Sequence, residues 1–222
     1  MPRTTVARRK TAKKPIRQKT RTKRGKQGER RKRLLVLMFV ILALMSVVVL
    51  KSCFMTIDIS KLDYPSFVQQ DFIGKDGHSR TGKSMKRVND IVIHYVANPG
   101  SSAKANRDFF DSSQSSVSAH FVVGLKGEVI QCVPLNEQSS ASNDRNPDTI
   151  SIEVCHPKAN GKFNSKTYGA LIKLTAWLCD EFGLDEEDVI RHYDITGKDC
   201  PKYYVEHPDA WEKLKKDVKK AM

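Results

Sequence analysis

The run Asp90-Ile91-Val92-Ile93-His94-Tyr95-Val96 carries the clearest strand signal in the sequence. It is apolar and rich in β-branched residues, and Asn98-Pro99-Gly100 stops it, so it predicts a strand buried within a sheet. Residues 149–155 alternate strictly in character, which predicts a second strand with two different faces.

The segments around these two strands predict the remaining elements. A hairpin is expected within 117–133, and helices are expected over 102–112, over 166–182 and from about Pro208 onward. The order of strands and helices predicts a single α/β domain with a central mixed β-sheet flanked by helices.

The positive charge of the chain is confined to its beginning. The whole chain has 39 Lys+Arg and 25 Asp+Glu, for a formal net charge of +14. Residues 1–33 hold 16 of the bases and a single acid, Glu29, which leaves 23 bases and 24 acids for the remainder. A basic nucleic-acid-binding globule is therefore disfavoured, and no nucleic-acid partner is expected for the main domain.

A run of 17 residues, 34–50, holds no charged residue and is apolar on every side. As a helix it would span about 25 Å, at the short end of what crosses a bilayer. A core helix and a cleaved signal peptide fit less well, and Lys51 argues against a lipoprotein signal at Cys53. We therefore expect a single-pass anchor in the cell membrane at 34–50.

The basic block before this run determines the expected orientation. By the positive-inside rule, residues 1–33 form a cytoplasmic tail and the C-terminal domain is extracytoplasmic. The tail has almost no apolar residue, so it is expected to be disordered and to contact anionic lipid. Residues 51–87 are expected to form a linker and lead-in, and 88–222 the folded domain.

Five cysteines are present, and an odd number argues against a closed disulfide framework. Cys179 lies in a helical pattern and is expected in the core. Cys132 and Cys155 both fall on predicted strands, where either a disulfide or two core thiols is compatible with the sequence.

Several polar residues do not fit a core. His94 ends an apolar strand, Glu153 lies inside another, and His192 and Cys200 belong to the polar segment 191–201. Histidine and cysteine suit Zn²⁺, and a catalytic zinc takes three protein ligands and leaves one position for water. Taken alone the set is a weak signal, because a single histidine on a strand is more often a core residue.

Four stretches, in order, resemble the zinc-dependent N-acetylmuramoyl-L-alanine amidases, which share a fold with peptidoglycan recognition proteins and phage T7 lysozyme. The most specific stretch places His192 and Cys200 eight residues apart, with Lys198 two residues before the cysteine. The resemblance covers roughly 88–205, and its other three stretches are Ile91-Val92-Ile93-His94 with Asn98-Pro99, Ser118-Ala119-His120-Phe121-Val122-Val123 with Gly127 and Val129-Ile130-Gln131, and Ser151-Ile152-Glu153.

The resemblance implies a role for each of five residues. His94, His192 and Cys200 match the zinc ligands, although many relatives have an aspartate in place of the cysteine. Glu153 matches the general acid–base residue, and Lys198 matches the group that stabilises the oxyanion. The position that holds a tyrosine in some relatives is Ala119 here, which leaves the proton transfer to Glu153.

The resemblance implies a peptidoglycan hydrolase that cleaves the amide bond between N-acetylmuramic acid and L-alanine by zinc-activated water. With the anchor expected at 34–50, the function is that of a membrane-anchored enzyme, and a monomer is expected although the sequence does not determine the oligomeric state. A non-catalytic peptidoglycan-binding module of the same fold is the alternative. A third class, a cysteine hydrolase that uses Cys200 with His192, requires a thiolate held in a Cys–His pair.

Overall fold

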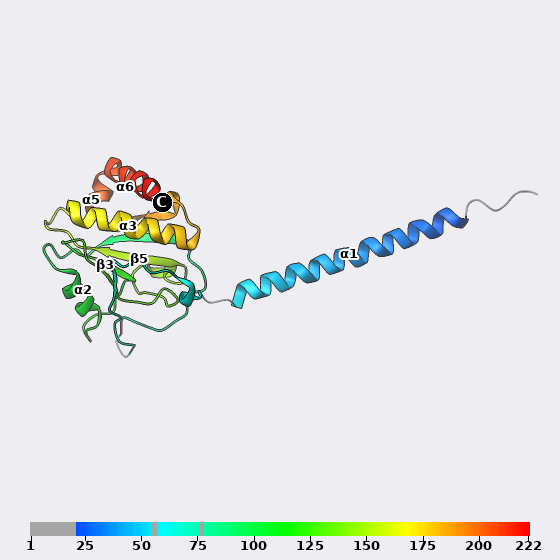
Figure 1. Cartoon of the computed structure of the whole chain (residues 1–222), viewed down its shortest axis with the longest axis horizontal. Helices are drawn as coiled ribbons and strands as arrows, with labels where there is room; N and C mark the ends of the chain where they lie inside the picture. The colour runs from blue at the N-terminus through cyan, green and yellow to red at the C-terminus, as the bar shows by residue number, and fades with distance from the viewer. Residues whose placement is uncertain (1–20, 55–56, 76–77) are drawn as a thin grey trace, which may run out of the picture. The chain divides into compact units, whose positions relative to one another are not determined.

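The computed structural model describes residues 21–54, 57–75 and 78–222. The chain divides into two compact units, Met1–Cys53 and Phe54–Met222. Figure 1 shows the helix of the first unit in blue to cyan and the α/β fold of the second unit in cyan to red.

The first unit is described from Arg21 onward, where the chain forms the helix α1 (Arg21–Phe54). The tail predicted to be disordered covers residues 1–33, and its first part, 1–20, lies outside the described residues. Residues 21–33 belong to α1 instead. Most of them are lysine, arginine, glutamine or glutamate, which are good helix formers, and no proline interrupts them, although Gly25 and Gly28 are unfavourable in a helix.

The predicted membrane anchor at 34–50 is wrong. Within the described ranges, no helix has the length and apolar character needed to cross a membrane. The uncharged run spans only about 25 Å and is bounded at once by Arg33 and Lys51, whereas the hydrocarbon core of a bilayer is about 30 Å thick. The predicted single-pass localisation, with a cytoplasmic N-terminus and an extracytoplasmic domain, is overturned by the same finding.

A six-stranded mixed sheet forms the centre of the second unit, which confirms the predicted architecture. Its strand order is β1-β4-β3-β5-β2-β6, and every neighbouring pair is parallel except the β3–β4 hairpin. The strands are β1 (Val68–Gln70), β2 (Asp90–Tyr95), β3 (Phe121–Val123), β4 (Val129–Gln131), β5 (Thr149–Val154) and β6 (Val189–Arg191).

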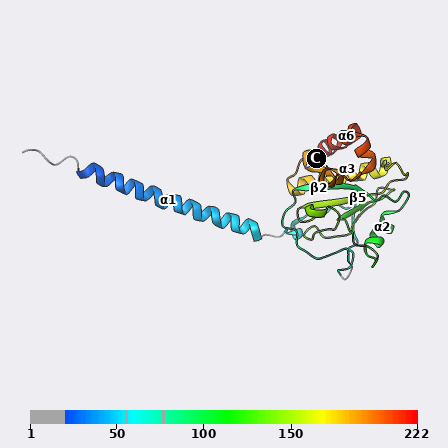
Figure 2. The same ribbon diagram turned by 180° about the vertical axis from the view of Figure 1, so that it is seen from behind.

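Helices cover both faces of this sheet. The long helix α3 and the C-terminal helix α6 lie on one face, and α2 lies on the other (Figures 1 and 2). The α-helices are α2 (Ala103–Phe110), α3 (Ser165–Phe182), α4 (His192–Thr196), α5 (Lys202–Glu206) and α6 (Pro208–Ala221), and the short 3₁₀ helices are η1 (Ile59–Lys61), η2 (Asn143–Arg145) and η3 (Glu186–Asp188).

Local sequence determines the ends of α3. The side chain of Asn164 accepts hydrogen bonds from the backbone of Lys166 and Thr167, which satisfies two amides that the first turn leaves free. Gly183 ends the helix with φ of 66°, a left-handed conformation that glycine adopts at little cost. The helix predicted over 166–182 is thus confirmed.

The two faces of β2 and β5 have different neighbours because successive side chains alternate along a strand. Ile93 of β2 and Ile152 of β5 belong to the large apolar cluster that also contains residues of α3 and α6. The residues that follow each of them, His94 and Glu153, lie on the opposite face. They are also direct partners in the β2–β5 register, so the fold places them side by side.

Of the segment predicted as a linker and lead-in, 51–87, residues 57–75 and 78–87 are folded into the domain. Its strand β1 pairs with β4, and Ile73 and Met85 are 1% and 0% exposed. Single apolar residues in a polar segment carry no periodic signal, which is why the sequence pattern suggested a linker.

We expect Ile73→Ala to lower the free energy of unfolding by about 2–5 kcal/mol, the usual cost of truncating a buried isoleucine. Gln69→Ala is the matched control, because this side chain in the same segment is exposed, and its expected effect is about 0.5 kcal/mol or less. Denaturant unfolding of both variants measures the difference. Equal stabilities would show that the lead-in contributes nothing to the core.

The thiols of Cys132, Cys155, Cys179 and Cys200 are free and buried. Cys132 and Cys155 are therefore two core thiols and do not form a disulfide. The predicted core position of Cys179 is confirmed. The side chain of Cys53 lies outside the described residues.

Candidate metal and catalytic site

Three predicted ligands meet at the carboxyl end of β2. His94 lies near the end of that strand, His192 is the first residue of α4, and Cys200 follows α4 closely. The amide of Tyr193 donates to the carbonyl of Cys200 at 2.9 Å, which closes this segment into a loop and returns the thiol to the histidines. One potential ligand atom from each of the three lies within 4.8 Å of the others, and all three side chains are buried.

The distances suit a small metal ion. The sulfur of Cys200 lies 3.8 Å from Nδ1 of His94, and the rings of His94 and His192 have their centroids 4.6 Å apart. Zinc bond lengths of about 2.0–2.1 Å to nitrogen and about 2.3 Å to sulfur place neighbouring tetrahedral ligands about 3.5 Å apart. Two imidazoles and a thiol are also the donor types that zinc prefers.

Two residues that sequence reasoning missed lie against the histidines. The hydroxyl of Ser142 is 3.5 Å from Nε2 of His94 and 2.8 Å from the hydroxyl of Ser151. The amide oxygen of Asn143 is 3.4 Å from Nε2 of His192. Partners of this kind orient metal-binding imidazoles, and here they leave Nδ1 of His94 facing Cys200. Nothing in the spacing of the sequence indicates them.

Burial determines the charge of the three candidate ligands. It lowers the pKa of His94 well below its usual value, with smaller contributions from His192 and Lys198, and it lowers the pKa of His192 in the same way. Burial raises the pKa of the Cys200 thiol to about 12. The metal-free cluster is therefore neutral at pH 7, so a cation would bind without displacing protons from the imidazoles and would release one from the thiol.

Glu153 and Lys198 complete the group. Oε2 of Glu153 is buried and has no hydrogen-bond partner among the residues that the structure describes. Burial raises the pKa of this carboxyl to about 8, and the positive charge of Lys198 opposes the rise. The Lys198 side chain itself is exposed. A carboxyl whose pKa lies near neutrality can both accept and donate a proton.

One cavity of about 450 Å³ contains all five predicted residues in its lining. Its volume is within the usual range of small-molecule sites. The rest of its lining comes mainly from loops and the end of α2, and includes Phe110, Val117, Ser118, Ser140, Ala141 and Asn146. The structure thus brings the sequence-predicted residues together, and the wall adds residues that no motif indicated.

His120 is not among the expected metal ligands and has a packing role. Its Nδ1 accepts a hydrogen bond from the amide of Ser151 at 3.0 Å, and its Nε2 lies 2.9 Å from the carbonyl of Glu137. Both ring nitrogens are used, so the ring joins β5 to the loop that lines the cavity.

A buried His₂Cys cluster at the end of parallel strands lies beside a carboxyl whose Oε2 has no hydrogen-bond partner among the described residues. This combination defines a candidate metal-dependent hydrolase of the α/β class. The chain belongs to the N-acetylmuramoyl-L-alanine amidase family, whose model matches residues 84–203. The family resemblance predicted from the four sequence stretches is confirmed.

Individual relatives support this membership. The chain is 34% identical over 178 residues to the N-acetylmuramoyl-L-alanine amidase BlyA of Bacillus subtilis, covering 71% of this chain and 48% of the relative. It is 32% identical over 168 residues to CwlL of Bacillus licheniformis, covering 68% and 46%. The chain therefore spans about half the length of these curated relatives.

A solved structure shows the same fold. The catalytic domain of XlyA is 29% identical and superposes with a TM-score of 0.60, covering 68% of this chain and 98% of that domain. The similarity therefore extends over nearly the whole of that catalytic domain.

Proposed function

We propose that this chain is a peptidoglycan amidase that hydrolyses the amide bond between N-acetylmuramic acid and the L-alanine of the stem peptide. The observation that carries this proposal is the meeting of His94, His192 and Cys200 with Glu153 in one cavity. Family membership supplies the substrate class, because the relatives BlyA and CwlL are named for this activity.

The proposed ligands of a zinc ion are His94, His192 and Cys200. Zinc, when bound, supplies a Lewis acid that polarises the amide carbonyl and makes a water molecule more acidic. The rest of the chemistry falls to the side chains. Burial of the ligand side chains strengthens the local electrostatic interactions.

Glu153 is proposed to move the protons. Its Oε2 atom makes no hydrogen bond in the described part of the chain, so it is free to accept a proton from water and return it to the leaving amine. Lys198 is among the residues that line the same cavity. There it would stabilise the negative charge that develops on the carbonyl oxygen, a contribution typically of about 3 kcal/mol.

Two other functions fit less well. A non-catalytic binding module of this fold does not need an acid–base group, and here Glu153 is retained together with the three candidate ligands and Lys198. A cysteine hydrolase needs a thiol with a lowered pKa, whereas burial raises the pKa of Cys200 to about 12.

Mass spectrometry of digested peptidoglycan tests the proposed function. We expect the full chain to release peptides that begin with a free L-alanine amine, and glycan that keeps an intact lactyl carboxylate. A chelator should prevent the release, and added zinc should restore it.

The possible products separate the alternatives. Fragments that still join muramic acid to alanine would show that a different bond is cleaved. Adsorption to insoluble peptidoglycan without any soluble product would favour the binding module.

A further inference from the structure

Part of the cavity wall is built from two loop segments, 115–118 and 137–141, of which residues 116–118 and 140–141 line the cavity. Ser118 and Ser140 line the cavity and pair as an isolated antiparallel bridge. Their backbone groups exchange two hydrogen bonds, of 3.3 and 3.1 Å. The wall lies outside the six-stranded sheet, so its position depends on what holds this bridge.

A single residue of the lead-in, Ser79, contacts both sides of the bridge. Its carbonyl accepts hydrogen bonds from the hydroxyls of Ser118 at 2.6 Å and Ser140 at 3.2 Å. Its own hydroxyl donates to the carbonyl of Ser115 at 3.0 Å. Because Ser79 is 1% exposed, water cannot replace these bonds easily.

The next residue, Arg80, holds the second loop segment. Its Nε and Nη2 atoms donate to the two carboxylate oxygens of Glu137, at 2.8 and 2.9 Å, and Nη1 donates to the carbonyl of Ile73 at 2.6 Å. The guanidinium is almost fully buried. A two-bond contact of this type fixes both distance and orientation, so it fixes the position of Glu137 next to the wall.

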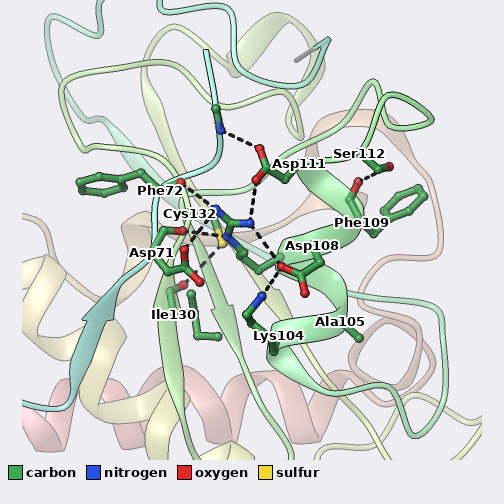
Figure 3. A network of polar contacts seen from close by, with 12 residues as sticks. Asp71, Phe72, Lys104, Ala105, Asp108, Phe109, Asp111, Ser112, Ile130 and Cys132 are labelled. Carbon is green, nitrogen blue, oxygen red and sulfur yellow. Dashed lines mark hydrogen bonds and ion pairs between the residues drawn. The ribbon is translucent and has the colours of Figure 1, made fainter. Parts of the chain in front are cut away.

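Hydrogen bonds also connect the lead-in to α2 and to the residue that follows it (Figure 3). Arg107 of that helix donates to the carbonyls of Asp71 at 3.1 Å and Phe72 at 2.7 Å, and the carboxylate of Asp111 accepts from the amide of Gly74 at 2.6 Å. The segment is thus held at one end by α2, which contributes Phe110 to the cavity, and at the other end by the wall.

We propose that Ser79 and Arg80 are positioning residues of the catalytic cavity, and that they fix the wall against which the substrate binds. The inference rests on the proposed amidase function and deepens it. Neither residue is among those that line the cavity, so both act through Ser118, Ser140 and Glu137. Both precede the family-matched region, which begins at residue 84, and no family motif indicated them.

Steady-state kinetics of Arg80→Ala in the full chain, with a soluble muramoyl peptide as substrate, tests the proposal. We expect KM to rise on the order of 10- to 100-fold, the worth of one or two lost hydrogen bonds, because a displaced wall weakens contacts made equally to the substrate and the transition state. We expect kcat to stay within about threefold, because the metal ligands and Glu153 are held by other elements. Arg80→Lys keeps the charge and should give an intermediate KM.

Lys215→Ala is the matched control. Lys215 is also a buried cation paired with a carboxylate, that of Glu187, but it lies on α6, on the face of the sheet opposite α2 (Figure 1). The Lys215→Ala variant should lower the melting temperature as Arg80→Ala does, and should leave KM unchanged. An unchanged KM in Arg80→Ala, or equal rises in both variants, would overturn the proposal and leave Arg80 a purely structural role.

Amide hydrogen exchange tests the positioning without any activity. Well below the melting temperature, Arg80→Ala should speed exchange at the bridge amides of Ser118 and Ser140 by at least about tenfold, and Lys215→Ala should not. Unchanged exchange at these amides would overturn the proposal even if KM rises. A parent chain that does not cleave peptidoglycan would refute the amidase function, while exchange would still decide whether Arg80 positions the wall.

Discussion

Replacing Glu153 with glutamine is expected to lower the amidase rate by about 10²–10⁴, the usual worth of a general acid–base group. Glutamine keeps the size of the side chain but cannot accept or deliver a proton at neutral pH. Oε2 of Glu153 has no hydrogen-bond partner within the described residues, so the substitution breaks no hydrogen bond at that atom. The rate, the zinc content and the melting temperature should be measured on the same preparation.

Glu128→Gln is the control for this experiment. The Glu128 carboxylate accepts a hydrogen bond from the amide of Lys126 in the β3–β4 turn and does not line the cavity, so its replacement should leave the rate nearly unchanged. If Glu153 were only a structural partner of Lys198, its replacement would reduce the melting temperature and spare the rate per folded molecule. A folded Glu153→Gln chain within about threefold of the parent rate would refute the proposed proton transfer.

Much of the sheet could be predicted because its strands carry local signals. The apolar, β-branched run at 90–96 became the strand β2, and the alternating run at 149–155 became β5. The hairpin was also predicted, but β3 begins only at Phe121. Before it, Ser118 pairs with Ser140 in the cavity wall, a contact that alternation along one strand cannot reveal.

The lead-in and the first helix show what local patterns miss. Arg80 and Glu137 are 57 positions apart and Ile73 is a single apolar residue, so only the folded chain reveals that 57–75 and 78–87 belong to the domain. The apolar run at 34–50 led to the opposite error, because a local pattern there predicted a feature that the structure does not support. Its composition suggested a membrane span, but no helix in the described part of the chain is long and apolar enough to cross a membrane.

The five candidate site residues were predicted mainly through resemblance to a family, and the structure places all five at one cavity. Their proposed roles stay predictions until they are tested. Ser142 and Asn143 could not have been found in this way, because their place beside His94 and His192 depends on how the loop before β5 folds. Asn143 has φ of 53°, a backbone conformation that no sequence spacing indicates.

Replacing Cys200 with serine is expected to weaken zinc binding by more than ~10²-fold. A neutral hydroxyl is a poor zinc ligand at pH 7, and even the residues that only orient zinc ligands are worth about 10- to 100-fold in affinity. The parent chain should carry about one zinc ion, and removing that ion with a chelator should abolish cleavage and lower the melting temperature. Elemental analysis and competition with a chelator measure the occupancy and the affinity.

Cys179→Ser separates loss of a ligand from loss of structure. Cys179 is also a buried free thiol, but it lies in α3 on the other face of the sheet, so its replacement should reduce stability and leave zinc affinity unchanged. A bound ion stabilises only a fold that holds it, so a chelator should lower the melting temperature of Cys179→Ser and scarcely affect Cys200→Ser. Full zinc occupancy in Cys200→Ser would remove this residue from the ligand set, and equal zinc loss in both variants would attribute the effect to unfolding.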